Sequence, residues 1–143
     1  MSVPTPPAPR RPQPLIDQEN EFFWEGVKLG ELRVQQCDSC RCLIHPPLPH
    51  CASCGSFELG YRSVSGRGTV YSHATVHRPL VPPFTEPYSV VVVELAEGIR
   101  LVSQLVGVPP GDVAIGLPVE VEFTEVEEGL TLPLFRPIHG ESG

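Results

Sequence analysis

The stretch CDSCRCLIHPPLPHCASCG, residues 37–55, decides how this chain folds. It contains two C-x2-C pairs, Cys37 with Cys40 and Cys51 with Cys54, and ten residues separate them. A two-residue spacer lets one tight turn aim both thiolates at the same ion, and two pairs complete the tetrahedral four-sulfur coordination that zinc prefers. Because four sulfurs leave no position for water or substrate, the pattern predicts a structural zinc ion in a zinc ribbon.

Three other side chains near the pairs could compete as ligands. Cys42 is the odd cysteine, and His45 and His50 lie between the two pairs. Since four cysteines already satisfy the metal, we expect both histidines to stay outside the coordination sphere. For Cys42 we expect an ordinary small side chain, with a swapped ligand or a reactive thiol as the alternatives. Gly55 suits the turn after the second pair, because glycine readily takes a positive φ.

The region before the ribbon divides into a tail and a helix. Residues 1–16 contain six prolines and are predicted to form an extended linker or tail. Residues 17–29 (DQENEFFWEGVKL) predict one short helix, with Asp17 as its N-terminal cap and Gly30 as its stop. Its apolar face must pack on the rest of the domain or on a partner, and it includes Phe22, Phe23 and Trp24.

The region after the ribbon is expected to be β structure. The unbroken β-branched run in the second of its strands predicts burial on both faces. Glu97-Gly98 and Glu128-Gly129 predict tight hairpin turns. Five strands with mostly short connections predict a small closed OB-fold barrel, so the chain as a whole is expected to be mainly β. The expected strands are Gly68–His77, Tyr88–Leu95, Ile99–Val106, Val119–Phe123 and Leu130–Phe135.

Alternation along the strands places individual side chains. In the first strand one face is expected to carry Val70, Ala74 and Val76, and the other Tyr71, His73 and His77. The two histidines would lie about 13 Å apart, which is too far for one metal, so a surface role is expected with a proton shuttle as the alternative. In the fourth strand we expect a solvated acidic face, rather than an acid–base pair, formed by Glu120 and Glu122.

Composition and missing motifs exclude several classes of function. The net charge is −7, with 10 Lys and Arg against 17 Asp and Glu, whereas a nucleic-acid binder needs a basic surface. No apolar run reaches the roughly 18 residues of a membrane span or the form of a signal peptide, which predicts a cytoplasmic protein without membrane contact. The sequence contains no nucleophile elbow, P-loop, dinucleotide-binding or zinc-protease motif.

The order of helix, four-cysteine ribbon and five-stranded barrel resembles the family of zinc-ribbon and OB-fold proteins associated with acyl-CoA metabolism. That family was long catalogued as a domain of unknown function. The resemblance covers about residues 17–138. It rests on Phe23-Trp24-Glu25-Gly26, Leu32, the two cysteine pairs, His45-Pro46-Pro47, Gly68-Thr69-Val70-Tyr71-Ser72, Val76-His77, Phe84, Pro87-Tyr88 and Leu134-Phe135-Arg136-Pro137.

The resemblance implies a role for the chain. It is similar to non-catalytic partners of thiolase-like, lipid-transfer-protein-type aldolases, which cleave hydroxyacyl-CoA by retro-aldol chemistry in steroid side-chain degradation. Such a domain follows a hydratase domain in some relatives, and the proline-rich start here looks like that linker. The resemblance therefore implies a hetero-oligomeric lyase complex in lipid metabolism, with zinc as structural cofactor and acyl-CoA as ligand. The expected divisions are 1–16 (linker or tail), 17–30 (helix), 31–60 (ribbon), 61–138 (barrel) and 139–143 (tail).

Binding of CoA would require cations for its phosphates and apolar surface for its other parts. The candidate cations are Arg67, Arg78 and Arg100. The loop between the first two barrel strands offers an apolar ridge for CoA or a partner, or else a lid on the barrel itself, and contains Leu80, Val81 and Phe84. Two alternatives to an accessory subunit stay open: a nucleic-acid-binding ribbon and OB module, and an independent thioester-acting enzyme.

Overall fold

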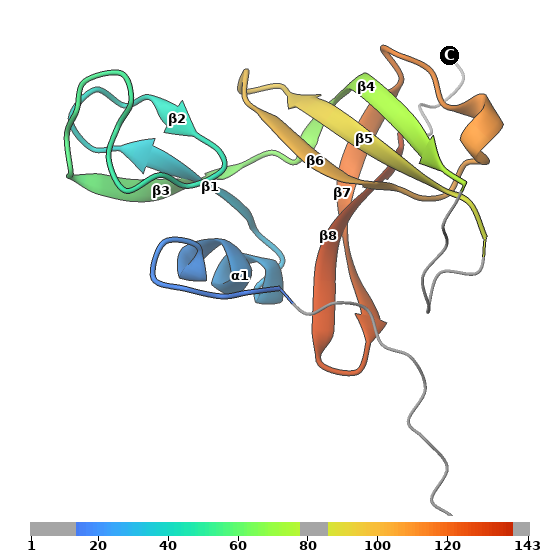
Figure 1. Cartoon of the computed structure of the whole chain (residues 1–143), viewed down its shortest axis with the longest axis horizontal. Helices are drawn as coiled ribbons and strands as arrows, with labels where there is room; N and C mark the ends of the chain where they lie inside the picture. The colour runs from blue at the N-terminus through green and yellow to red at the C-terminus, as the bar shows by residue number, and fades with distance from the viewer. Residues whose placement is uncertain (1–13, 78–85, 139–143) are drawn as a thin grey trace, which may run out of the picture.

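The fold is seen in a computed structural model that describes residues 14–77 and 86–138. A three-stranded ribbon sheet and a five-stranded barrel lie side by side, and a helix lies beneath the ribbon next to the barrel (Figure 1). Neither helix of the described part has the length or apolar character needed to cross a bilayer. The elements are α1 (Glu21–Lys28), β1 (Leu32–Cys37), β2 (Leu43–Ile44), β3 (Leu59–Val64), β4 (Arg67–Val76), β5 (Tyr88–Leu95), β6 (Arg100–Leu105), a 3-10 turn η1 (Pro110–Asp112), β7 (Pro118–Glu127) and β8 (Leu130–Pro137).

Helix α1 begins later than the sequence predicted, because a separate turn precedes it. The side-chain oxygen of Asp17 accepts hydrogen bonds from the N–H groups of Glu19 (2.9 Å) and Asn20 (3.0 Å). Asp17 therefore closes this turn, and the residue at the N-cap is Asn20. Asn20 makes no side-chain cap but donates from its amide to the carbonyl of Leu15 (2.8 Å), which fixes the segment leading into the helix.

Helix α1 ends at Lys28, and Gly30 acts as the predicted stop just beyond its C-cap, Leu29. This glycine has φ +77°, and its N–H donates to the carbonyl of Val27 (3.2 Å). The N–H of Glu31 donates to the carbonyl of Gly26 (2.8 Å), which completes a Schellman motif. The chain thereby reverses directly into β1.

The ribbon sheet has the order β2-β1-β3, and both pairings are antiparallel. Strand β3 pairs along the whole of β1, from Leu32 opposite Val64 to Cys37 opposite Leu59. The expected border between residues 60 and 61 therefore lies inside β3. The buried Gln35 of β1 holds the loop after β2, because its amide donates to the carbonyl of Leu48 (2.9 Å) and accepts from the N–H of the same residue (2.8 Å).

The barrel confirms the predicted five-stranded closed sheet. Its strand order is β4-β5-β6-β8-β7, and every pairing is antiparallel except that of β6 with β8. Apolar side chains fill the interior of the barrel, because burying their surface away from water is favourable. The core contains Leu32 of β1 together with Val70, Val91, Val93, Leu95, Leu101, Leu105, Val113, Val119 and Phe135.

Two expectations about strand faces were wrong. A β-bulge between Val70 and Ser72 reverses which side chains face the core, so that Val70 is opposite Val93 while Ala74 is opposite Val90. The predicted shared face of Val70, Ala74 and Val76 therefore does not exist. In β5 burial alternates, and the outer face is half-buried rather than fully buried, because the barrel covers one side of this strand.

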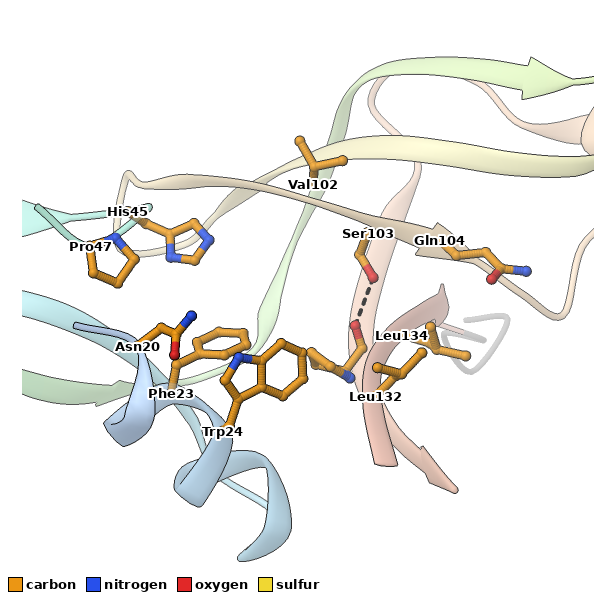
Figure 2. A pocket seen from close by; sticks show the side chains of 11 residues that line it. Asn20, Phe23, Trp24, His45, Pro47, Val102, Ser103, Gln104, Leu132 and Leu134 are labelled. Carbon is orange, nitrogen blue, oxygen red and sulfur yellow. Dashed lines mark hydrogen bonds between the residues drawn. The ribbon is translucent and has the colours of Figure 1, made fainter. Parts of the chain in front are cut away.

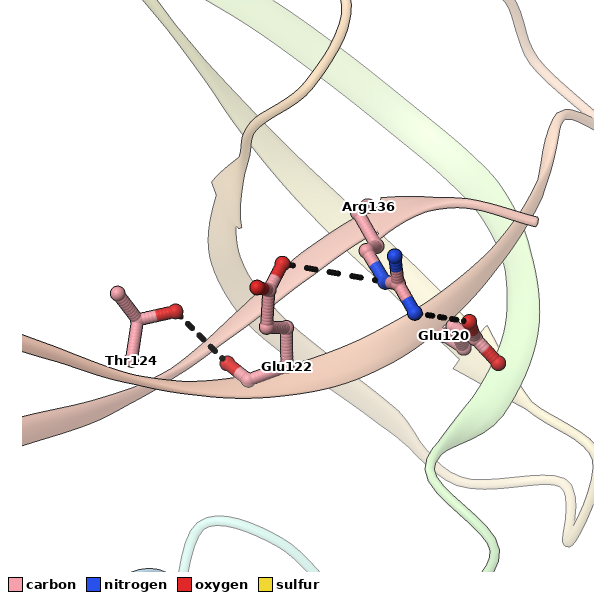
Figure 3. Close-up of polar contacts among 4 residues, drawn as sticks. All are labelled: Glu120, Glu122, Thr124 and Arg136. Carbon is pink, nitrogen blue, oxygen red and sulfur yellow. Dashed lines mark hydrogen bonds and ion pairs between the residues drawn. The ribbon is translucent and has the colours of Figure 1, made fainter. Parts of the chain in front are cut away.

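The acidic face predicted on β7 is present, and it is bridged by one arginine. Arg136 of β8 binds Glu120 through Nη2 (3.0 Å) and approaches Glu122 through Nε (3.8 Å) (Figure 3). The hydroxyl of Thr124 donates to the carbonyl of Glu122 (3.4 Å). These pairs lie at the surface, where each contributes about 0–1 kcal/mol, so they offset repulsion between the carboxylates more than they hold the barrel together.

A close approach of β4 to β5 predicts a strong effect at one glycine. A Cβ atom at Gly68 would collide with the backbone carbonyl of Glu94, which cannot move without breaking the strand pairing. We expect Gly68→Ala to lower the free energy of unfolding by about 2 kcal/mol or more. Gly111→Ala is the matched control, because a Cβ there meets no atom within 4 Å. Urea unfolding of both variants gives the comparison, and equal stabilities would contradict it.

Candidate functional site

The four cysteines of the two pairs form one cluster. Their sulfur atoms all lie within 4.8 Å of one another, with 3.6 Å between Cys37 and Cys54 and 3.6 Å between Cys40 and Cys51. Four sulfurs about 2.3 Å from a zinc ion at tetrahedral angles lie about 3.8 Å apart, so the cluster fits the metal. Cys37 and Cys51 are buried, whereas Cys40 and Cys54 are exposed. These side chains form a structural zinc site.

The two halves of the site repeat one backbone conformation. In the first, the N–H of Arg41 donates to the carbonyl of Cys37 (2.9 Å); in the second, the N–H of Gly55 donates to the carbonyl of Cys51 (2.8 Å). The residue after each pair has a positive φ, +66° at Arg41 and +78° at Gly55. The prediction for Gly55 is confirmed, and Arg41 holds the same conformation at a steric cost.

The electrostatics of the free thiols explain why the cluster requires a cation. The backbone N–H of Cys40 is the main cause that lowers the pKa of Cys37 to about 6. The backbone N–H of Cys42 acts to lower the pKa of Cys40, but desolvation of its sulfur within the cluster and the sulfurs of Cys51, Cys37 and Cys54 outweigh it and raise that pKa to about 12. Four neighbouring thiols therefore do not ionise together on their own, and a divalent cation offsets the repulsion of four thiolates.

The apolar core of the ribbon is too small to hold this unit alone. It consists of Cys37, Ile44 and Cys51, with Leu59 packed against them. Two of its three buried members are thus metal ligands. We conclude that metal binding supplies the folding free energy of this segment.

The competing ligands lie outside the cluster, as predicted. Neither His45 nor His50 belongs to it. The ring of His50 lies 5.8 Å from that of the exposed Phe57. Cys42 is exposed, and its sulfur lies 3.6 Å from the carbonyl of Leu43. In the barrel, His73 is exposed in β4, and His77 is exposed just beyond the end of that strand.

The aromatic side chains of α1 contact other parts of their own chain. Phe22 stacks on Tyr61 of β3, with ring centroids 5.6 Å apart and an interplanar angle of 5°. Phe23 packs against the barrel core and meets Trp24 edge to face at 5.1 Å. All three side chains remain half-buried, so contact with a partner protein stays a prediction.

The structure describes two of the three arginines that were predicted to bind CoA phosphates, Arg67 and Arg100. Arg67 is exposed at the start of β4, and its carbonyl accepts from the N–H of Ala96 beside the β5–β6 turn (2.9 Å). Arg100 opens β6 after the same turn, so both arginines lie at one end of the barrel. Its Nε donates to Glu94 (3.1 Å), and its guanidinium carbon lies 3.7 Å from the centre of the Tyr71 ring. Arg78, Leu80, Val81 and Phe84 lie outside the described residues.

Sequence reasoning missed three features of these sites. Arg41 adopts a conformation in which glycine is usual, Gln35 clamps the ribbon loop, and Tyr71 holds Arg100 by a cation–π contact. The repeat of the two cysteine pairs could have indicated the first, because position 41 corresponds to position 55. The other two depend on strand register, and no local pattern reveals them.

Metal content gives a direct check of the cluster. We expect one zinc ion per chain by elemental analysis of the purified protein. Cys51→Ser should lose the metal on dialysis and unfold the ribbon, because a buried thiolate ligand is removed. Cys42→Ser is the matched control and should retain full metal content, since its sulfur is outside the cluster. A folded protein without bound metal would contradict the assignment.

The two turns that follow the cysteine pairs predict opposite changes in stability on substitution. Gly55→Ala should lower stability by about 1 kcal/mol, because a side chain is forced into a positive φ. Arg41→Gly should leave stability unchanged or raise it by up to about 1 kcal/mol, because relief of strain offsets the added freedom of the unfolded chain. Thermal unfolding in the presence of zinc measures both, and a large loss in Arg41→Gly would show that the arginine side chain itself is required.

Comparisons with known proteins agree with this architecture. Residues 24–60 match the family described as the rubredoxin-like zinc ribbon domain of ChsH2, and residues 61–124 match the C-terminal OB-fold domain of ChsH2. A solved structure, titled Ltp2-ChsH2(DUF35) aldolase, has a chain that is 45% identical with a TM-score of 0.83, covering 87% of this chain and 98% of that one. A DUF35-family protein of unknown function from Sulfolobus solfataricus shares the fold, with a TM-score of 0.58 at 14% identity over 84% of this chain and 85% of that one.

Curated relatives fall into two groups. A probable enoyl-CoA hydratase alpha subunit of Thermomonospora curvata is 45% identical over 131 residues, which is 92% of this chain and 41% of the relative. The 3-oxo-4,17-pregnadiene-20-carboxyl-CoA hydratase alpha subunit of Mycobacterium tuberculosis is 41% identical over 79% of this chain and 36% of its own length. The chain thus spans about two fifths of these two relatives.

The second group consists of shorter archaeal proteins. A DUF35 domain-containing scaffold protein of Methanocaldococcus jannaschii is 34% identical over 97 residues, which is 65% of this chain and 67% of that protein. The ribbon, the barrel and the four-cysteine site therefore form a single known arrangement, and this chain belongs to the DUF35 family, with zinc-ribbon and OB-fold domains of the ChsH2 type.

Proposed function

We propose that this chain is a non-catalytic accessory subunit, or domain, of a thiolase-fold aldolase that cleaves a hydroxyacyl-CoA. The observation that carries the proposal is its likeness to the chain in the Ltp2-ChsH2(DUF35) aldolase, at 45% identity over nearly the whole of that chain. The hydratase names of the two longer relatives support a hydratase domain upstream. The pregnadiene-carboxyl-CoA in the name of the Mycobacterium tuberculosis relative supports a steroid-type substrate. Thiolates that bind zinc need a reducing compartment, which supports a cytoplasmic location.

The proposed reaction places its catalytic groups on the partner. A retro-aldol cleavage removes the proton of a β-hydroxyl, breaks the bond between the α and β carbons, and leaves the electron pair on the thioester as an enolate that is then protonated. A general base and an oxyanion site are needed for these steps. In this chain the zinc site is closed by four sulfurs, so its role is to shape a docking unit rather than to polarise a substrate.

The chain's own contribution would be to hold the CoA end of the substrate. Arg67 and Arg100 lie at one end of the barrel, beside the β5–β6 turn. The stacking of Arg100 on Tyr71 and its bond to Glu94 fix the guanidinium before a ligand arrives, which reduces the entropic cost of binding a phosphate. We propose that both arginines contact CoA phosphates, and that helix α1, which carries Phe22, Phe23 and Trp24, adds contact with the partner. The same roles are proposed for Arg78 and the apolar residues Leu80, Val81 and Phe84.

Co-expression with the thiolase-fold partner from the same genome tests the proposal. We expect the two chains to co-purify as a hetero-oligomer, and cleavage of a β-hydroxyacyl-CoA, followed by release of the carbonyl product, to require both. A partner that is fully active alone, or two chains that do not associate, would refute the accessory role.

Arginine variants within the complex separate CoA binding from assembly. The double variant Arg67→Ala/Arg100→Ala should raise the KM for the thioester about 10-fold, because charged hydrogen bonds to phosphate are lost. Arg62→Ala is the matched control, since this exposed arginine lies on β3 of the ribbon. Size-exclusion chromatography confirms that each complex stays intact, and an unchanged KM in the double variant would contradict the assignment of these two residues.

A further inference from the structure

A crevice of about 410 Å³ lies between the helix and ribbon on one side and the barrel on the other. Its walls come from α1 with Phe23 and Trp24, from the loop after β2 with His45, and from strands β6 and β8 (Figure 2). Pockets of this volume at the junction of two units are the usual place for small ligands. The crevice is distinct from the zinc cluster and from the end of the barrel that carries Arg67 and Arg100.

Most polar side chains in the crevice wall are already bonded within the chain. The amide of Asn20 donates to the carbonyl of Leu15 (2.8 Å), and its oxygen accepts from the N–H of Asp17 (2.8 Å). The hydroxyl of Ser103 donates to the carbonyl of Pro133 (2.7 Å), and Gln104 also has a partner. Among the residues that the structure describes, none that lines the crevice is charged. The wall is therefore neutral and mainly apolar.

His45 is the exception among these polar groups. Its imidazole lines the crevice next to the ring of Phe23, 5.7 Å away, and its buried Nδ1 has no hydrogen-bond partner among the described residues. Burial lowers the pKa of His45, so the ring is neutral near pH 7. A buried nitrogen without a partner is unfavourable. The imidazole itself lines the crevice, so it is the polar group that an oxygen atom of a ligand there would meet.

We propose that the crevice binds a neutral, mainly hydrocarbon ligand that carries one hydroxyl or carbonyl oxygen, and that His45 is the hydrogen-bond partner of that oxygen. Trp24 and Phe23 provide the apolar wall, and Val102 at the rim, 66% exposed in the free chain, would be covered by the ligand. Phosphates and carboxylates are disfavoured, because the described lining of the site contains no cation and an unpaired charge is costly to bury. This inference stands apart from the accessory role and is tested on the chain alone.

Trp24 provides a built-in reporter, because it is the only tryptophan in the sequence and it lines the crevice. We expect 1-octanol to change Trp24 fluorescence saturably, with a dissociation constant on the order of 0.1–1 mM. The ¹⁵N resonances of the His45 ring should change along the same binding curve. Octanoate, which has the same chain length and a negative charge, should bind at least about 10-fold more weakly.

Such a ligand could be the acyl end of a thioester or a free neutral lipid. A third probe, octanoyl-CoA, distinguishes these two sources. If octanoyl-CoA gives the same His45 change as 1-octanol, the crevice accepts the acyl end of a thioester, which supports the proposal with that source. If 1-octanol binds and octanoyl-CoA does not, the proposal is supported with a free neutral lipid as the source. If 1-octanol has no effect while addition of the thiolase-fold partner shifts the His45 resonances, the crevice is a protein contact and the proposal is overturned.

Variants locate the binding in the crevice. Val102→Asp introduces a charge at the rim and should abolish 1-octanol binding, whereas Ile115→Asp, at a similarly exposed site (72%) outside the crevice, should leave it unchanged. His45→Phe keeps a ring but removes the hydrogen bond, and should weaken 1-octanol binding about 5-fold. Equal binding by Val102→Asp and the parent chain, or by His45→Phe and the parent chain, would overturn the proposal.

Discussion

The attraction between four cysteine thiolates and one divalent cation is the constraint on which the rest of this structure depends. The ribbon has only a few buried apolar side chains, and two of them are ligand cysteines. The constraint reaches the barrel through β1, which starts with Leu32 in the barrel core and ends with Cys37 in the metal cluster. A single six-residue strand therefore connects the metal to the barrel interior.

The junction between the two units explains why α1 carries so many aromatic side chains. Phe22 faces the ribbon through Tyr61, whereas Phe23 packs toward the barrel core. Neither the small ribbon sheet nor the barrel alone would cover this helix. Where the coverage ends, a neutral crevice remains between α1 and the strands β6 and β8. The proposed ligand site is thus a product of how the two units meet, and not of either unit alone.

Local spacing was enough to predict the zinc site, the five barrel strands and Gly30 as the stop after α1, because each depends on residues close in sequence. Features set by long-range pairing were not predictable. The bulge after Val70 reverses the inward face of β4, and Tyr71 meets Arg100 only because β4, β5 and β6 are neighbours. Asp17 was expected to cap the helix, but its side chain closes a separate turn before the helix. The local sequence is compatible with either a cap or a turn at this residue.

The pairing of β6 with β8 closes the barrel, and it is the most weakly bonded part of its wall. It is parallel, with one registered pair, Leu105 opposite Phe135, and one further bond from the N–H of Val106 to the carbonyl of Phe135 (2.8 Å). Pro133 in β8 has no N–H to donate to a neighbouring strand. Its carbonyl accepts a hydrogen bond from the hydroxyl of Ser103 in β6 (2.7 Å). This seam is also one wall of the crevice. A molecule bound in the crevice would contact both β6 and β8. Its binding free energy would therefore add to the stability of the β6–β8 pairing.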